Sequence, residues 1–412
     1  MSNFTLPLGI ESLEIISQTV DTQGSITFDV KSTETSTPCH KCGQLTSKRH
    51  SAGEMITVRH LPILDKPVYL RIRVIRYECL TCEDHPTTSE KYDWMDRKSK
   101  TTKALDSYIN RQIIHSTVED VSRKERINYK IIESALHRGV KKEVDWSSYK
   151  DLSTIGIDEI SLLKGHQDYV VIVSAKDKKG VLSVIAVLPD RLKETVKAFL
   201  ESIPDYLRKT VKAVCTDMYD GFVQSAIEVF GSGVVVVDRY HVSKLYREPL
   251  DQLRISEMKR LKAILPQEEY AKLEGMMWIL RKNHECLSKI NKEQLSLFYK
   301  YSPKIKEAHK HALKLTHIFN THHNRKAALT MVSRWIESVQ ASKVIVFNGF
   351  IKTLIKYKSC ILNYFKDRRN SGFVEGLNNK IKVLKRRCYG ISKPETLFQR
   401  LFLDLSGFKV FA

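Results

Sequence analysis

The sequence predicts a multi-domain α/β protein, and three observations support this fold class. Paired cysteines lie in a strand-rich N-terminal segment, short strands alternate with helices in the middle of the chain, and helical periodicity dominates most of the remainder. At 412 residues the chain is long enough for two or three domains. The changes of pattern place segment boundaries at 1–92, 93–150, 151–242, 243–370 and 371–412.

The net charge of +21 is unevenly distributed. Residues 243–412 hold 34 Lys and Arg against 14 Asp and Glu, whereas residues 151–242 are slightly acidic, with 11 against 13. A basic chain around an acidic centre suits a polyanion held against bound divalent cations, and nucleic acid is the natural polyanion. The alternative is a basic protein with no polyanionic partner.

The sequence also indicates a cellular compartment. It contains no apolar run long enough to span a bilayer, and its first residues lack the basic start and apolar core of an export signal. We therefore expect no membrane partner and a cytoplasmic, nucleoid-associated protein of bacterial type. The eight cysteines should then be reduced, which favours metal binding over disulfides.

Two Cys-x-x-Cys pairs, separated by 36 residues, predict a zinc site. The pairs are Cys39 with Cys42 and Cys79 with Cys82. Four thiolates can surround zinc as a tetrahedron, and the metal would fold a module too small for a good core. Two alternatives remain open: one pair is redox-active, or His40 or His85 replaces a thiolate.

Residues 101–144 contain three short helical segments, which resemble a helix-turn-helix. Ser116 or Thr117 can cap the second helix, and Asn128 can cap the third. The last helix would then lie in a DNA major groove. Its polar face would consist of Lys130, His137 and Arg138. The alternative is a three-helix domain that binds no DNA.

The segment from 151 to 242 contains, in order, three strands, a helix, a strand, a helix and a last apolar strand. The second and third strands form a predicted hairpin about residues 177–180. This is the order of a ribonuclease-H-like sheet, in which the first and fourth strands lie side by side. Asp158 ends the first of these strands and Asp217 ends the fourth, so we expect the two carboxylates to be adjacent.

A third carboxylate, Glu375, stands among amides and cations on the polar face of a helix over residues 371–390. Adjacent carboxylates repel one another unless a cation lies between them, so Asp158, Asp217 and Glu375 predict a site for Mg²⁺ or Mn²⁺. The alternative is that each aspartate merely ends its strand and that the glutamate is solvated.

Two basic segments flank this predicted metal site. After the last strand, Asp238 is expected to support the site without contacting metal, and Arg239 and His241 are candidates for orienting substrate phosphates. Further cations continue along the helix of Glu375 and are expected to bind phosphate; they are Lys382, Lys385, Arg386 and Arg387. The closing segment, 395–408, predicts an amphipathic helix that returns to the core.

Asp217 and Glu375 are 158 residues apart, and most of the chain between them is helical. We interpret residues 243–370 as an all-helical insertion within the core, which would clamp the DNA backbone or offer Trp278 or Trp335 as a platform for a base. The alternative is that both tryptophans pack between helices. The five histidines between 309 and 323 form no compact ligand set and are interpreted as surface cations or phosphate contacts.

The cysteine pairs, the three-helix segment and four longer motifs together resemble the ISL3 family of bacterial insertion-sequence transposases. The motifs are GIDEISLLKGHQDYVVIV, TDMYDGF, VDRYHVSKL and SGFVEGLNNKIKVLKRRCYGI. The resemblance covers almost the whole chain. It implies a DDE catalytic triad on Asp158, Asp217 and Glu375, and a zinc-binding module with a helix-turn-helix for the transposon ends.

On this basis the expected function is that of a DNA transposase that binds terminal inverted repeats, cleaves DNA and transfers the strands by a two-metal mechanism. Its partners would be double-stranded DNA, as transposon ends and as target, and further copies of the chain, since two ends must be brought together. One alternative is a DNA-binding regulator with a decayed nuclease core. A metal-dependent nuclease without joining activity is another.

Overall fold

The computed structural model describes residues 8–162, 169–282, 284–369 and 371–411 of the chain. Contacts within the chain divide it into two compact units. The N-terminal unit comprises residues 1–142, 387–389 and 398–412, and the second unit comprises residues 143–386 and 390–397.

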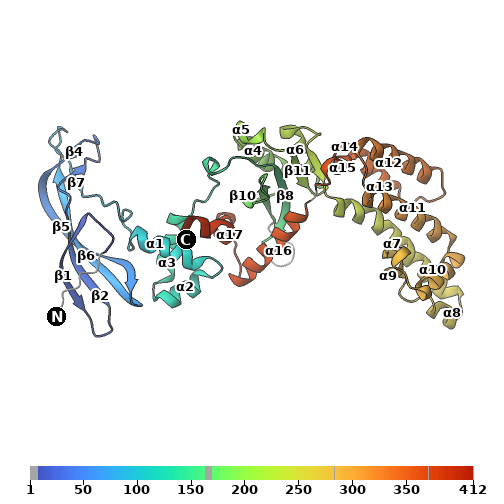
Figure 1. Ribbon diagram of the computed structural model, residues 1–412, viewed down its shortest axis with the longest axis horizontal. Coiled ribbons are helices and arrows are strands. Elements are labelled where there is room, and N and C mark those ends of the chain that lie inside the picture. Colours follow the sequence, from blue (N-terminus) through green and yellow to red (C-terminus); the bar gives the residue numbers. More distant parts are fainter. Residues whose placement is uncertain (1–7, 163–168, 283, 370, 412) are drawn as a thin grey trace. The chain divides into compact units, whose positions relative to one another are not determined.

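The N-terminal unit begins with a five-stranded sheet in the order β1-β2-β6-β5, with β7 paired to β6 (Figure 1). Only the β2–β6 pairing is parallel. A separate two-stranded ladder joins β3 and β4. The strands are β1 (Leu13–Val20), β2 (Ile26–Ser32), β3 (Thr37–Pro38), β4 (Leu45–Thr46), β5 (Lys48–Ile63), β6 (Lys66–Glu78) and β7 (Thr87–Ser89).

The long hairpin of β5 and β6 comes before the second cysteine pair, and β6 alternates between buried and more exposed residues. Val68, Leu70 and Ile72 are fully buried, whereas Tyr69 and Arg71 at the intervening positions are half-buried and exposed, respectively. Leu64 and Asp65 form the connection with φ angles of 49° and 64°, the left-handed conformation that suits a tight hairpin turn.

Three helices follow, as predicted. They are α1 (Lys103–Ile113), α2 (Val118–Glu125) and α3 (Tyr129–Gly139). The side chain of Thr117 accepts a hydrogen bond from the backbone N–H of Asp120, and Asn128 accepts one from Lys130, so the expected caps of the second and third helices are in place. Arg126, in the left-handed conformation, ends α2.

The last helix, α17 (Pro394–Phe411), differs from the expectation that the closing segment returns to the core. From Phe398 onward it belongs to the N-terminal unit, where Leu403 joins the buried cluster of α1–α3. Gly407 permits a close approach, because a Cβ there would lie 2.8 Å from Cδ1 of Ile114. The buried Arg400 also donates a hydrogen bond to the carbonyl of Ser116. The apolar face of α17 therefore completes the core of the three-helix domain.

The second unit is built on a five-stranded sheet in the order β10-β9-β8-β11-β12. The β10–β9–β8 part is antiparallel, and β8–β11–β12 is parallel. This topology confirms the predicted ribonuclease-H-like sheet. The strands are β8 (Thr154–Ser161), β9 (Tyr169–Lys176), β10 (Leu182–Leu188), β11 (Ala213–Thr216) and β12 (Val235–Val237).

Helices α4 (Lys193–Ser202), α5 (Asp205–Arg208) and α6 (Asp220–Phe230) accompany this sheet. Val196 and Leu200 of α4 join Ile155 and Ile157 of β8 in one buried cluster, which makes the odd-numbered side of β8 the face toward these helices. The even-numbered side, with Gly156, faces α16 (Gly372–Arg387). The sheet is therefore covered on both faces, as its apolar central strands require.

The region between β12 and α16 is helical, as expected for an insertion, and α7 leads from the sheet into it (Figure 1). Part of it has its own apolar cluster, which includes Leu261, Leu295 and Phe298. The helices are α7 (Arg239–Ile264), α8 (Gln267–Ala271), α9 (Met276–Arg281), α10 (Lys289–Tyr301), α11 (Pro303–Asn320), α12 (Arg325–Gln340), α13 (Asn348–Lys356), α14 (Lys358–Leu362) and α15 (Tyr364–Asp367).

The docking of α17 predicts that Leu403→Ala destabilises the N-terminal unit by about 2–5 kcal/mol, because it opens a cavity in the core of the three-helix domain. Thermal unfolding followed by circular dichroism measures the change. The exposed Lys409→Ala, on the same helix, is the control and should leave the melting temperature unchanged. Equal stability of the two variants would contradict the packing described for α17.

Candidate active site and metal centre

Two acidic residues lie at the ends of neighbouring parallel strands. Ile157 of β8 is in register with Thr216 of β11, so the residues that follow, Asp158 and Asp217, lie side by side. Parallel strands end at the same edge of a sheet, which explains why two residues 59 positions apart meet there. This arrangement agrees with the adjacency expected from the order of the strands.

These two carboxylates are partly buried, and burial raises the pKa of both Asp158 and Asp217. Hydrogen bonds to each carboxylate oppose this rise, and the charge of His241 opposes it to a smaller extent. Neither forms an ion pair with a Lys or Arg side chain of the described chain. Strands lie about 4.8 Å apart, and unit charges at that separation repel by roughly 3 kcal/mol at an effective dielectric constant of about 20. A divalent cation would relieve this repulsion, so the pair fits a metal site.

Helix α16 packs directly on β8 because Gly156 has no side chain. A Cβ at this position would lie 2.4 Å from Cγ2 of Val374, closer than any real contact. One flank of the helix then meets the strand ends at two points. Ser371 donates a hydrogen bond to Asp238, which follows β12, and Asn378 donates from Nδ2 to Oδ2 of Asp158 at 2.6 Å.

Glu375 lies between these two contacts on α16. It is four residues after Ser371 and three before Asn378, which places it on the same side of the helix. Its side chain is exposed. Among the described residues, the ligand atoms of the four N-terminal cysteines all lie within 4.8 Å of one another. The ligand atoms of the three predicted carboxylates do not form such a group. The structure thus pairs the aspartates and places the glutamate on the flank that reaches them.

Asp238 has two structural roles at the end of β12. Its Oδ1 accepts a hydrogen bond from the backbone N–H of Tyr240 and caps α7, while Oδ2 accepts the bond from Ser371. Arg239, predicted to orient phosphate, instead donates hydrogen bonds to Asn320 and Tyr364. Both side chains therefore help to fix the helices around the acidic pair.

The other predicted DNA-binding side chains fall into two groups. Those with partners inside the protein are His137 with Gln399, Arg138 with Asp106, Lys385 with the carbonyl of Ser161, and Arg387 with Asp404. Those that stay exposed, with no side-chain partner among the described residues, are Lys130, Lys382 and Arg386. Only the second group keeps its charge free for phosphate without breaking an internal contact.

Asn378 was not singled out from the sequence, although it stands one helical turn after Glu375 in the motif EGLNN. Its Nδ2 holds Asp158, while its buried Oδ1 has no hydrogen-bond partner. The second oxygen of Asp158, Oδ1, accepts from the backbone N–H of Glu159 at 2.8 Å. A search for amides spaced three residues from a candidate carboxylate on one helix would have found this position.

The four predicted zinc ligands come together in the N-terminal unit. The sulfur atoms of Cys39, Cys42, Cys79 and Cys82 all lie within 4.8 Å of one another. The Cys42–Cys79 and Cys79–Cys82 sulfur distances are 3.6 and 3.7 Å. A tetrahedral zinc with Zn–S bonds of about 2.3 Å has sulfur–sulfur edges of about 3.8 Å, so the cluster has the size of a zinc site.

The electrostatics of the cluster also suit a metal that binds thiolates. Backbone N–H groups of Cys42 and Lys41 lower the pKa of Cys39 to about 6, and the backbone N–H of Cys82 lowers that of Cys79. The neighbouring thiol of Cys42 raises the pKa of Cys82 to about 12. The backbone of the two Cys-x-x-Cys turns thus brings the four sulfur atoms together and also stabilises negative charge on two of them.

The two histidines proposed as alternative ligands have other partners. Nδ1 of His40 lies 2.9 Å from Oγ1 of Thr88, and Nδ1 of His85 lies 3.1 Å from the carbonyl of Cys79. These contacts hold the two Cys-x-x-Cys turns in place, and the four sulfur atoms remain as the ligand set.

Comparison with known proteins agrees with this arrangement of domains. A family model for ISL3 elements, described as a transposase, matches residues 155–401. The zinc-finger of the transposases of IS204, IS1001, IS1096 and IS1165 matches residues 35–82, and the helix-turn-helix domain of transposase family ISL3 matches residues 90–140. The fold and these matches define a transposase with a zinc ribbon, a helix-turn-helix and a DDE domain. The chain belongs to the ISL3 family, which confirms the resemblance seen in its motifs.

Relatives match over most of their length. The chain is 26% identical over 374 residues to the transposase for insertion sequence element IS1001 of Bordetella parapertussis, covering 90% of this chain and 89% of the relative. It is 23% identical to the transposase for IS1557 of Mycobacterium tuberculosis, covering 90% and 86%. A solved structure, the Drosophila P element transposase strand transfer complex, aligns with 77% of this chain and 94% of that chain, at 13% identity and a TM-score of 0.42.

Among the described helices, none is long and apolar enough to cross a membrane.

The cysteine cluster predicts that the purified protein carries about one zinc ion per chain and that Cys79→Ser loses it, because three thiolates hold zinc less well than four. Elemental analysis by mass spectrometry measures the metal, and circular dichroism should show partial unfolding. Cys286→Ser, which changes an exposed cysteine outside the cluster, should keep its zinc. A wild-type protein without zinc would refute this site.

Proposed function

We propose that this transposase cleaves DNA at the ends of its element and joins the freed 3′-hydroxyls to a target by DDE chemistry. Asp158, Asp217 and Glu375 would hold two Mg²⁺ or Mn²⁺ ions. The observation that carries the proposal is the side-by-side pair of partly buried aspartates without a Lys or Arg ion-pair partner among the described residues, next to the flank of α16 that carries the glutamate.

The bound ions would supply Lewis-acid stabilisation of the attacking and leaving oxygens in an in-line displacement. In the first reaction, the oxygen of water would bond to phosphorus as the bond to the 3′-oxygen breaks, which frees a 3′-hydroxyl. In the second, this hydroxyl would bond to a target phosphorus and lose its proton to solvent, while the bond from that phosphorus to the target's own 3′-oxygen breaks and leaves a new 3′-hydroxyl. No protein side chain forms a covalent bond in either reaction. Asn378 fixes the orientation of Asp158 through Oδ2, so that the carboxylate is held in position before substrate arrives.

Substrate phosphates need cations near the acidic pair, and α16 carries them. Lys382 is exposed seven residues after Glu375, two turns along the same side of the helix, and Arg386 follows one turn later. Neither side chain has a partner among the described residues, so each can bind phosphate at no cost to the fold. His241, whose charge acts on both aspartates, is a further candidate for contact with the scissile phosphate.

Recognition of the terminal inverted repeats is proposed for the three-helix domain. The exposed side of α3 carries Tyr129, Lys130 and Ser134, and these side chains would enter the major groove. Arg138 would act indirectly, since its bonds to Asp106 and Thr101 tie α3 to the start of α1. Because two ends must be cut and joined together, the active form would be a dimer or a larger oligomer on DNA.

The proposed triad predicts that Asp217→Asn lowers DNA cleavage by at least about a thousandfold, because the substitution removes a metal ligand. End binding should stay intact, because only one charge at the edge of the sheet is lost. The measurement is nicking of a supercoiled plasmid that carries the native ends, with and without Mg²⁺, alongside a gel-shift assay. The control is Asp220→Asn, a variant that should remain active. The carboxylate of Asp220 accepts hydrogen bonds from Lys356 and Tyr357 and is not part of the proposed triad. Normal strand transfer by Asp217→Asn would refute the assignment.

The contact with Asp158 predicts that Asn378→Ala lowers cleavage by about 10–100-fold and raises the Mg²⁺ concentration needed for half-maximal cleavage, because the carboxylate loses the partner that orients it. A Mg²⁺ titration of the cleavage rate gives both quantities. The neighbouring Asn379→Ala removes an exposed amide from the same helix and should behave as wild type. Identical Mg²⁺ dependence in the two variants would show that Asn378 has only a packing role.

A further inference from the structure

Backbone N–H groups of two neighbouring residues hold the paired aspartates. Oδ1 of Asp158 accepts a hydrogen bond from the backbone N–H of Glu159 at 2.8 Å, and Oδ1 of Asp217 accepts one from the backbone N–H of Tyr219 at 2.9 Å. Each bond ties a carboxylate to a backbone segment, so the direction of both carboxylates depends on where these segments lie. Contacts that hold Glu159 and Tyr219 in place therefore also set the geometry of the acidic pair.

The side chains of Glu159 and Tyr219 meet at one guanidinium group, that of Arg191. Nη1 of Arg191 donates to Oε2 of Glu159 at 3.2 Å. The guanidinium carbon lies 5.2 Å from the ring centre of Tyr219 and 5.4 Å from that of Tyr169, the first residue of β9. Arg191 itself stands in the connection between β10 and α4. One side chain thus links the ends of two strands to the residue that caps α6.

The ring of Tyr219 has a fixed position against α6. A Cβ at Gly221 would lie 2.7 Å from Cε1 of this ring, so the ring lies directly against the backbone of the first helical turn. The ring also meets the edge of Phe222, which is fully buried, with 4.9 Å between the ring centres. Because the ring is fixed to α6, its contact with Arg191 also holds the start of α6 in place.

Stability alone does not explain this arrangement. The side chains of Arg191 and Glu159 are 47% and 25% exposed, and an ion pair this accessible to water contributes little to the stability of a fold. A planar guanidinium can nevertheless restrict three neighbours at once, through one ion pair and two ring contacts. Two of these neighbours are the residues that donate hydrogen bonds to the proposed metal ligands.

We propose that Arg191 is a positioning residue that orients both aspartates of the acidic pair for the binding of divalent cations. It acts through Glu159 and Tyr219, whose backbone N–H groups hold the two carboxylates. The inference rests on the proposed function, which supplies the metal site. By charge alone, the guanidinium would repel a bound cation and weaken its binding. Positioning has the opposite sign, because loss of the guanidinium frees both backbone segments and the carboxylates no longer converge.

The test is Mn²⁺ binding to the full-length, zinc-loaded protein, measured through the electron paramagnetic resonance signal of free Mn²⁺. Arg191→Gln should weaken the binding by about tenfold, although it removes a positive charge, and Glu159→Gln should weaken it to a similar extent. The double variant should bind within about twofold of the weaker single variant, because both substitutions break the same link. Asp217→Asn identifies the Mn²⁺ that the acidic pair binds.

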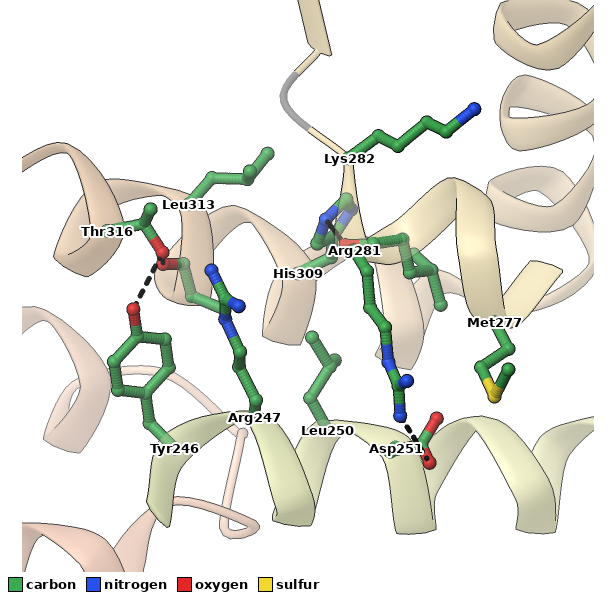
Figure 2. Close-up of a pocket in the computed structure, with 12 residues that line it drawn as sticks. Tyr246, Arg247, Leu250, Asp251, Met277, Arg281, Lys282, His309, Leu313 and Thr316 are labelled. Carbon is green, nitrogen blue, oxygen red and sulfur yellow. Dashed lines mark hydrogen bonds and ion pairs between the residues drawn. The ribbon is translucent and has the colours of Figure 1, made fainter. Parts of the chain in front are cut away.

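Arg281 of the helical insertion offers a matched control. Figure 2 shows its guanidinium reaching Asp251 of α7, beside a cavity of about 40 Å³ that has room for only a few water molecules. Nη2 of Arg281 lies 3.5 Å from Oδ2 of Asp251, the guanidinium carbon lies 5.8 Å from the ring centre of Trp278, and the side chain is 48% exposed. Its partners therefore resemble those of Arg191 but do not bond to the acidic pair, and Arg281→Gln should keep the wild-type affinity for Mn²⁺.

Cleavage assays separate this role from contact with DNA. For Arg191→Gln, the Mg²⁺ concentration at half-maximal cleavage should rise about tenfold, while the DNA concentration at half-maximal cleavage should stay within about twofold of wild type. A rise in the DNA concentration alone would assign Arg191 to DNA contact and overturn the proposal.

Three results of the Mn²⁺ titration would also overturn it: binding by Arg191→Gln that equals or exceeds that of wild type, additive losses in the double variant, or an equal loss in Arg281→Gln. Wild-type Mn²⁺ binding that does not depend on Asp217 would overturn the proposed metal site itself, and the role of Arg191 with it. A site that needs Asp217 but not Arg191 would overturn only the role of Arg191.

Discussion

Two carboxylates lie side by side where β8 and β11 end, and burial removes much of the water that would screen their repulsion. A fold that needed only stability would place an apolar or neutral residue there. Much of the surrounding structure serves to keep this pair in place: Gly156 admits α16, Asn378 holds Asp158, and Ser371 ties the start of α16 to Asp238. Two like charges held together in a partly buried position lower the stability of the fold, and such a cost is expected at a functional site.

The backbone framework could be predicted from sequence because it depends on local pattern. Small polar residues identified the caps Thr117 and Asn128, and the order of strands identified the neighbours of β8. The paired cysteines were equally informative, since their spacing encodes a ligand set. Each of these signals lies within a few residues of the feature that it predicts, or depends on a topology with few alternatives.

The role of individual polar side chains could not be predicted in the same way, because it depends on partners far away in the chain. Arg138 and Arg239 were expected to contact DNA, yet they bond to Asp106 and to Asn320, which no sequence period relates to them. Asn378 was overlooked because an amide on a helix gives no signal until the strand opposite is known. The docking of α17 was misassigned because the periodicity of an amphipathic helix predicts that one face is buried but does not identify the element against which it packs.

Gly156 shows how closely two distant segments depend on one another. A single added methyl group there would overlap Val374, so the backbone of β8 and the side chains of α16 share one small volume. Such positions cannot vary independently. Among related chains, a larger residue at the strand position should occur only together with a smaller one at the helix position, which would leave a record of this contact in any set of diverged sequences.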